Sequence, residues 1–248
     1  MDRSTVTKQR EIMKADFIAL AACVSDQRAG RPHPPVQKPA GADARIVDLP
    51  PAETLDLSEP DLRDCIATRR SVRQFSDRAL SLGELSWLLW ATQGVHQASG
   101  PNTFRTVPSA GARHPFETYL AVNRVENVPP GIWRYLPLSH QIVHVADRPA
   151  LPDLLIAATL GQPFAGRAAV VFAWSCIPYR AEWRYLTMAH KNSLLDAGHV
   201  CQNLYLACQG AALATCAIAA YDQKAMDDLL GLDGTDEFTV YLAPVGRP

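Results

Sequence analysis

Hydrophobic and polar positions follow different patterns on the two sides of residue 57. Residues 1–57 are rich in proline and alanine and show no steady hydrophobic period. Because proline lacks an amide donor and blocks helix formation, this composition predicts an extended or partly ordered N-terminal arm. From residue 58 onward, apolar positions recur with helical and strand periods. The pattern therefore predicts an arm over 1–57 and one folded domain over 58–248.

Two stretches near the start of the domain carry helix-start signals. Ser58 with Asp61, and Ser81 with Glu84, have the spacing of a capping box. In this motif the hydroxyl and the carboxylate satisfy amides that the first helical turn leaves free. We expect the first helix to end near Arg70.

The remaining periodicity mixes helices and strands without strict alternation, which favours an α+β fold over a doubly wound sheet. Strand-like alternation or continuous apolar runs cover 117–123, 131–137, 140–146, 168–177 and 238–246. Helical periods cover 150–161, 182–213 and 223–231. We expect 131–137 and 140–146 to form a hairpin, 168–177 to be a central strand buried on both faces, and 182–213 to be one long central helix.

Composition limits the classes of function. The chain has 248 residues and is 48% hydrophobic, enough for a substantial core, and its formal net charge is -1. No overall field favours nucleic acid or an anionic membrane surface, so any anion site must be local. The six cysteines lack zinc-type spacing, and no stretch approaches the length of a membrane span. We expect a cytoplasmic protein with reduced thiols, no metal site and neither a nucleic-acid nor a membrane partner.

The segment TRRSVRQF, residues 68–75, concentrates three arginines and a serine. If the chain runs extended after the helix, Ser71 and Arg73 point to the same side, and Arg69 can turn to meet them. A helix C-terminus repels anions, so binding there requires side chains. Guanidinium groups and a hydroxyl suit a phosphate monoester through charge-assisted hydrogen bonds. The alternative is that these basic residues close a helix and lie in solvent.

Two further stretches can place chemistry near such a site. In VPSAGARHPFE, residues 107–117, four small residues lie between Pro108 and Pro115, which predicts a narrow loop that a flat ring can approach, or simply a tight surface loop. In the long helical pattern, Asp196 and Asn203 are among the polar residues that interrupt apolar positions. Such groups must be hydrogen-bonded or functional, and contacts to neighbouring loops are the commoner case.

Taken in order, these stretches resemble the FMN-dependent nitroreductase family, and within it the azoline dehydrogenases that form thiazoles and oxazoles in peptides. The stretches that carry the resemblance are RRSVRQF (69–75), PSAGARHPFE (108–117), LLDAGHVCQNLYLA (194–207), TCAIAAYD (215–222), LLGLDG (229–234) and YLAPVGRP (241–248). The resemblance implies a mostly antiparallel sheet flanked by helices, a long central helix, and a homodimer with FMN at its interface.

The resemblance also implies the residues of the FMN site. Those expected at the phosphate, the ribityl chain and the pyrimidine side are Arg69, Arg70, Ser71 and Arg73, with Gly246 and Arg247 returning to the phosphate. Those expected along the isoalloxazine ring, from across the dimer interface, are Pro108, Ser109, Ala110, Gly111 and Ala112. Those expected near its reactive nitrogen are Ile218, Ala219 and Ala220, where many family members have a glycine.

One position departs from the azoline dehydrogenase pattern. Where such proteins often carry a Lys-Tyr pair, this chain has Arg184 and Tyr185. An arginine stays protonated at any usable pH, so Arg184 cannot be the base that a lysine could be. Arg184 could instead bind a substrate carboxylate or phosphate, and Tyr185 could donate a proton. Alternatively, both residues face solvent.

These features together predict an FMN-dependent oxidoreductase that passes hydride through flavin N5. It would either carry electrons from NAD(P)H to a nitro, quinone or similar acceptor, or oxidise a dihydro-heterocycle in a small molecule or peptide. The chain has no G-x-G-x-x-G motif, so a nicotinamide would visit the flavin rather than occupy a Rossmann domain. Alternatives are a flavin-fragmenting or dehalogenating relative and a non-catalytic flavin-binding module. RNA binding is disfavoured by the charge balance.

Overall fold

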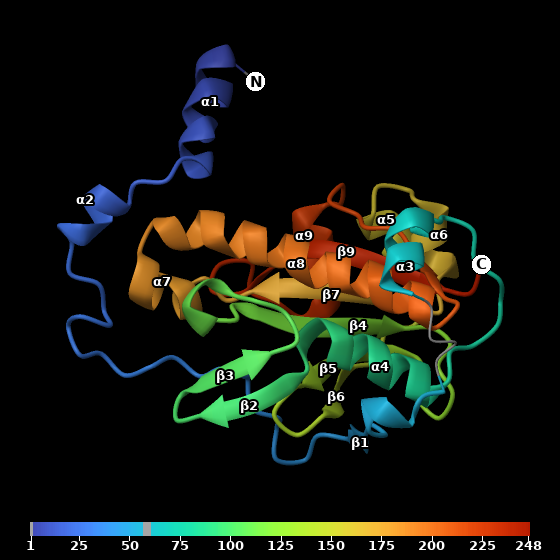
Figure 1. Ribbon diagram of the computed structural model, residues 1–248. Helices are drawn as coiled ribbons and strands as arrows, with labels where there is room; N and C mark the ends of the chain where they lie inside the picture. The colour runs from blue at the N-terminus through green and yellow to red at the C-terminus, as the bar shows by residue number, and fades with distance from the viewer. Residues whose placement is uncertain (1, 57–60) are drawn as a thin grey trace.

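A seven-stranded antiparallel sheet forms the centre of the molecule (Figure 1). The computed structural model describes residues 2–56 and 61–248. In spatial order the strands are β1 (Ile46–Asp48), β6 (Gln141–Ala146), β5 (Gly131–Leu136), β4 (Phe116–Val122), β7 (Val170–Cys176), β9 (Phe238–Gly246) and β8 (Ala214–Thr215). A separate hairpin joins β2 (Val95–Ser99) and β3 (Asn102–Arg105). The expected strands and the β5–β6 hairpin are confirmed.

Strand β7 is buried along its whole length between β4 and β9. Its side chains alternate between two apolar clusters, with Phe172 and Trp174 in one and Val171 and Ala173 in the other. A strand covered on both faces needs apolar residues at every position, which explains the continuous run that predicted it.

Helices cover both faces of the sheet. They are α3 (Leu62–Thr68), α4 (Leu82–Gln93), α5 (Leu151–Ala158), α6 (Pro163–Arg167), α7 (Tyr179–Tyr185), α8 (Met188–Gly210) and α9 (Gln223–Leu230). Leu88 of α4 and Leu204 of α8 belong to the Phe172 cluster, whereas Leu155 of α5 and Leu230 of α9 belong to the other. The architecture is therefore α+β in three layers, with α8 spanning one face.

The helix-start signals have different outcomes. At α4 the capping box is complete: Glu84 N–H donates to Ser81 Oγ at 3.1 Å, and Ser81 N–H donates to the Glu84 carboxylate at 2.8 Å. Ser58 lies outside the described residues, and Asp61 is the N-cap of α3. Helix α3 ends at Thr68, two residues before the expected end at Arg70.

The prediction of one helix over 182–213 was wrong. Helix α7 ends at Tyr185, and α8 begins at Met188. Between them Leu186 has a positive φ of 45° with ψ of -130°, a conformation through which an α-helix cannot continue. Helical periodicity survives such a break because each helix keeps its own apolar face, so the pattern read as one element.

The N-terminal arm divides into two halves. Residues 2–24 form α1 (Arg3–Gln9), a 3₁₀ turn and α2 (Phe17–Ala21), and α1 projects away from the body of the molecule (Figure 1). Further along, the arm follows α7, where Trp183 Nε1–H donates to Arg31 O at 3.1 Å. It then enters the sheet as β1, which pairs with β6. The second half of the arm is thus packed against the domain.

Candidate functional site

The arginine-rich segment lies against the C-terminal half of α8. Val72 N–H donates to Thr215 O at 3.1 Å, which fixes the segment beside β8. Ser71 Oγ and Tyr205 Oη share a hydrogen bond of 3.0 Å, and the Arg69 guanidinium lies 5.2 Å from the centre of the Tyr205 ring. Tyr205 Oη also accepts from Ala217 N–H at 2.8 Å. Tyr205 therefore joins the predicted 69–73 segment to the predicted 217–220 segment.

Two cations in this segment have no anionic partner. Among the residues that the structure describes, the Arg69 and Arg73 side chains make no hydrogen bond or ion pair, only ring contacts to Tyr205 and Phe164. Arg70 instead donates to backbone carbonyls of its own helix end. Two guanidinium groups and the exposed Ser71 are thus available to an external anion.

The C-terminal residues Gly246 and Arg247 lie beside the arginine-rich segment, but the Arg247 side chain forms an ion pair within the protein. Gly246 packs against Phe75, and a Cβ at Gly246 would lie 2.9 Å from that ring. Arg247 continues beside it, and its carbonyl accepts from Ser76 N–H at 2.9 Å. However, Arg247 Nη2 donates to Glu84 Oε1 at 2.6 Å, so its guanidinium is neutralised at the start of α4. In this arrangement Arg247 is not a free cation for a phosphate.

The predicted 217–220 segment exposes only part of its length. Ile218 exchanges two backbone hydrogen bonds with Leu242, of 2.8 and 3.1 Å, and its side chain lies in the core. Ala219 and Ala220 are exposed, and Ala220 O accepts from Gln162 Nε2 at 2.9 Å. Ile218 therefore anchors the segment, whereas Ala219 is the part that a ligand can reach.

The small-residue loop is held by the N-terminal half of α8. Ser109 Oγ donates to Asp196 Oδ2 at 2.6 Å, and Ala110 N–H reaches both oxygens of that carboxylate at 3.3 Å. Ser109 Oγ also accepts from His114 N–H at 2.9 Å. Burial raises the pKa of Asp196, and the hydrogen bond from Ser109 opposes that rise. The polar interruption of the helix thus anchors a neighbouring loop, as the commoner reading of such residues holds.

Gly111 brings the Arg184–Tyr185 pair to this loop. Its φ is 57°, in the left-handed region that favours glycine. A Cβ at Gly111 would overlap Tyr185 Oη and would lie 3.1 Å from Arg184 Nη1. Arg184 is exposed and Tyr185 is half-buried, and both side chains come close to the loop at this position. Positive φ and close approach together explain why this position is glycine.

A cavity of about 500 Å³ adjoins the loop. Its lining residues are Asn102, Phe104, Arg105, Val107, Pro108, Ser109, Gly111, Ala112, His114 and Arg184. Burial, with a smaller effect of the Arg105 charge, lowers the pKa of His114 to about 3, so its imidazole is neutral near pH 7. His114 Nε2 lies 3.1 Å from Thr103 O, where it donates. His114 is therefore a neutral, fixed wall of the cavity.

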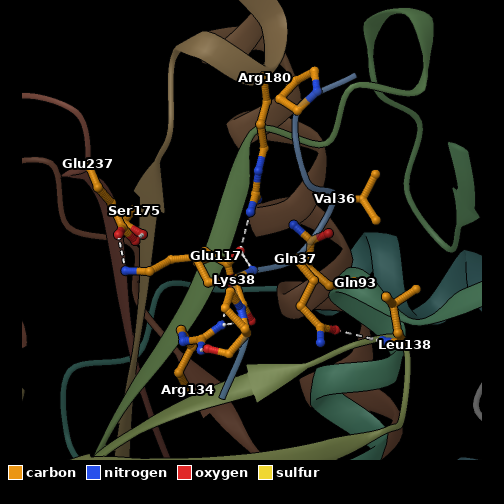
Figure 2. Close-up of polar contacts among 12 residues, drawn as sticks. Val36, Gln37, Lys38, Gln93, Glu117, Arg134, Leu138, Ser175, Arg180 and Glu237 are labelled. Carbon is orange, nitrogen blue, oxygen red and sulfur yellow. Dashed lines mark hydrogen bonds and ion pairs between the residues drawn. The ribbon is translucent and has the colours of Figure 1, made fainter. Parts of the chain in front are cut away.

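A buried network of charges supports the other side of the loop (Figure 2). The Glu117 carboxylate accepts from Arg134 at 2.9 Å and from Arg180 at 2.5 Å. Lys38 N–H also donates to Glu117, at 2.8 Å, and Lys38 Nζ pairs with Glu237. The arm is thereby fixed across the sheet. The network leaves no signal in the sequence, because its members are single residues on separate elements.

The described residues meet the requirements of neither a membrane-spanning helix nor a metal site. No helix among them combines the length and apolarity needed to cross a membrane. Within the same ranges, 2–56 and 61–248, no group of histidine, cysteine, aspartate and glutamate side chains could hold a metal ion.

Known proteins match this fold and most of the chain. A Methanocaldococcus jannaschii protein named as a nitroreductase is 35% identical over 205 residues, which are 83% of this chain and 98% of that protein. A crystal structure from Ralstonia eutropha, also titled a nitroreductase, superposes with a TM-score of 0.68 at 26% identity, covering 87% of this chain and 98% of that one.

Two more distant structures share the fold. One is the Escherichia coli microcin synthetase McbBCD complex with truncated pro-MccB17 bound, with a TM-score of 0.62, 19% identity, and coverage of 100% of this chain and 98% of that one. The other is a Desulfovibrio desulfuricans structure titled a nitroreductase in complex with FMN, with a TM-score of 0.53, 20% identity, and coverage of 77% and 88%.

The expected α+β nitroreductase-like fold is confirmed by these superpositions and by the sheet itself. Residues 66–247 match the nitroreductase family, which covers every expected site segment. The chain belongs to the nitroreductase family of oxidoreductases.

Proposed function

We propose that the protein binds FMN and reduces a small organic acceptor, such as a nitro compound or quinone, with electrons from NAD(P)H. The observation that carries the proposal is that Arg69 and Arg73, which flank the exposed Ser71 in the chain, form no hydrogen bond or ion pair with a described residue through their guanidinium groups. A flavin phosphate needs such a set of donors. Family membership and the FMN-bound fold relative support the same cofactor.

Residues of this chain are suited to bind two parts of FMN, its phosphate and its ring. Arg69, Ser71 and Arg73 would bind the phosphate, and Tyr205 would hold Ser71 in place through their shared hydrogen bond. FMN itself would supply hydride transfer. The exposed backbone at Ala219 offers a hydrogen-bonding edge to the ring.

The loop residues suggest that two copies of the chain build each site. Ser71 and Ser109 are both bonded to α8, at Tyr205 and Asp196. Nine residues of helix separate those anchors by about 13 Å, at 1.5 Å per residue. Leu194 and Leu195 of α8 are more than half exposed, an apolar surface suited to pairing two copies. A two-fold pairing across α8 would place the loop of one copy near the phosphate residues of the other.

Arg184 and Tyr185 would act on the substrate side. A permanently charged Arg184 suits anion binding and not proton abstraction. Tyr185, which contacts the loop at Gly111, is the proton donor that the site offers to a reduced acceptor. Oxidation of a dihydro-heterocycle needs a base instead, so reduction of an acceptor is the direction we propose.

A matched pair of double variants tests the cofactor assignment. Arg69→Gln with Arg73→Gln should lose flavin on gel filtration and bind added FMN at least tenfold more weakly, as expected for lost charge-assisted bonds. The control, Arg63→Gln with Arg78→Gln, removes the same charge from exposed side chains without ion pairs among the described residues. Equal flavin retention by the two doubles would contradict the proposed phosphate site.

Anaerobic mixing tests the direction of electron flow. The flavin-loaded protein should bleach on addition of NADH or NADPH and recover its colour when a nitro or quinone acceptor is added. A flavin that stays oxidised with both nicotinamides would contradict the reductase proposal and leave substrate oxidation as the alternative.

A further inference from the structure

Three guanidinium groups surround the 109–114 loop without a carboxylate partner. Arg105 is 8% exposed and Arg113 is 3% exposed, whereas Arg184 lies at the surface. None of the three forms an ion pair with any residue that the structure describes. A buried cation without a counter-charge is costly, so this concentration of positive charge requires an explanation.

The partners of the two buried arginines are neutral. Arg105 donates to Gln93 Oε1 at 2.8 Å and to Val36 O at 2.9 Å. Arg113 donates to Gly111 O at 3.0 Å, and its other donors reach His33 and Asn102. These bonds satisfy the N–H groups, but they do not neutralise the charges.

Nearby carboxylates are already engaged. Glu117 lies between Arg134 and Arg180. Asp196 accepts from Ser109 and from a loop amide. None of the described residues that line the cavity is acidic.

The pKa values of the arginines record the same imbalance. Burial lowers the pKa of Arg105 to about 10, and the charge of the Glu117 carboxylate opposes that fall without forming an ion pair with Arg105. Burial also lowers the pKa of Arg113, and the positive charge of Arg184 lowers it further. The guanidinium groups of Arg105, Arg113 and Arg184 together raise the positive potential of the loop.

The cavity beside the loop suits a planar ligand with one anionic group. Its volume of about 500 Å³ is in the range of small-molecule sites. Phe104, Val107 and Pro108 form its apolar wall, and Arg105 and Arg184 form its cationic wall. His114 cannot add a charge near pH 7, because its pKa is about 3.

We propose that this cavity binds an aromatic or heteroaromatic ligand through an oxyanion, with Arg184 as the group that contacts the anion. Arg184 is suited to this role because it is exposed, has no hydrogen bond among the described residues and reaches over Gly111. Arg105 and Arg113, which are buried, add to the positive electrostatic potential in the cavity. The ligand's role as substrate rests on the proposed function, but its binding does not require turnover.

Calorimetric titration of the purified full chain with 4-nitrobenzoate and with 4-nitrobenzamide tests the proposal. The two compounds have nearly the same shape and differ in charge. The wild-type protein should bind the acid about ten to a hundred times more tightly, as expected for a charge-assisted contact. Arg184→Gln should bring the two affinities within about threefold, and Arg184→Lys should keep part of the preference. Arg78→Gln, an exposed site without ion pairs among the described residues, should behave as wild type.

A parallel titration with NADPH and NADH identifies the source of the oxyanion. One outcome is that wild type binds the acid and the amide equally, while Arg184→Gln weakens the binding of NADPH but not that of NADH. The anion bound by Arg184 would then be the coenzyme phosphate, and the proposed oxyanion site would be supported. Equal affinities for acid and amide, with no selective effect on NADPH, would overturn the proposal.

The proposed function can fail separately. Protein that retains no flavin but shows Arg184-dependent binding of the acid would contradict the reductase and support the cavity. A protein that is an active reductase but prefers neither the acid nor NADPH would support the reductase and contradict the cavity proposal.

Discussion

At the Tyr205 end of α8, Arg69 and Arg73 form no ion pair with a described residue, and their segment is held by the Ser71–Tyr205 hydrogen bond and by the backbone bond from Val72 to Thr215. At the Asp196 end, the loop is held by several hydrogen bonds and lies beside a network of buried charges. Exposed charges cost little in an empty site because water screens them. A buried charge is costly unless it is paired, and in this network Arg134 and Arg180 are paired with Glu117. Changes at the first end should therefore cost the fold little, whereas the second end is part of the fold.

The largest effect should come from breaking the buried network at Glu117. Glu117→Gln leaves Arg134 and Arg180 buried without their carboxylate. We expect the free energy of unfolding to fall by about 3–5 kcal/mol, measured by urea denaturation. Asp43→Asn, at an exposed carboxylate without contacts among the described residues, should change it by less than about 0.5 kcal/mol. Similar effects of the two changes would contradict the difference between the two ends.

The next effect is a pH dependence at the buried end. Burial lowers the pKa of His114 from 6.5 to about 3. Between these values the unfolded chain takes up a proton that the folded chain does not, so stability should fall as pH falls through this window. Each pH unit below about 6 should remove at most about 1.4 kcal/mol.

The same urea measurement at several pH values in His114→Gln isolates the contribution of His114. The variant should lose stability less steeply than wild type between pH 6 and pH 4, because the titrating group is gone. Parallel curves for the two proteins would show that His114 titrates normally.

A smaller effect should follow from adding a methyl group at Gly111. Gly111→Ala meets Tyr185 Oη and also strains a backbone with φ of 57°. Gly100→Ala is the matched control, because Gly100 has φ of 56° and no atom within 4 Å of its added Cβ. Gly100→Ala should cost about 1 kcal/mol from backbone strain alone, and Gly111→Ala should cost about 1–2 kcal/mol more. Adding Tyr185→Phe should recover part of that difference. Equal losses in the two alanine variants would show that no close contact exists at Gly111.

The smallest effect on stability is expected at the exposed end. The Arg69→Gln, Arg73→Gln double variant should unfold within about 0.5 kcal/mol of wild type in the absence of flavin, because its side chains have no ion pairs among the described residues. With FMN present, only wild type should gain stability, by ligand linkage. A large loss without flavin would show that these arginines support the fold.

Local patterns were sufficient for much of the secondary structure. The capping box at Ser81 and Glu84 and the apolar strand 170–176 follow from interactions within a few residues or from burial on two faces, and both were predicted. The break at Leu186 was not predictable, because a leucine gives no local signal for a left-handed backbone. The pairing of β1 with β6 depends on contacts between residues almost a hundred positions apart.

The candidate site divides in the same way. The resemblance pointed to Ser109 and Gly111, and the structure places them at one loop together with Arg184. Tyr205 was missed, because an aromatic residue on an apolar helix reads as core. Arg247 was expected at the phosphate, but the structure pairs it with Glu84, a partner that sequence spacing cannot reveal.

The sequence by itself determined most element types of the domain, the absence of a strong overall charge and the presence of local groups of arginine and small residues, since these depend on composition and short-range order. Only the tertiary structure decided which arginines are neutralised and which are not. Charge pairing depends on distances between residues far apart in the chain, and burial sets how strongly each pair interacts. That is why Arg134 and Arg247 form ion pairs, whereas Arg69, Arg73 and Arg184 form none with the described residues.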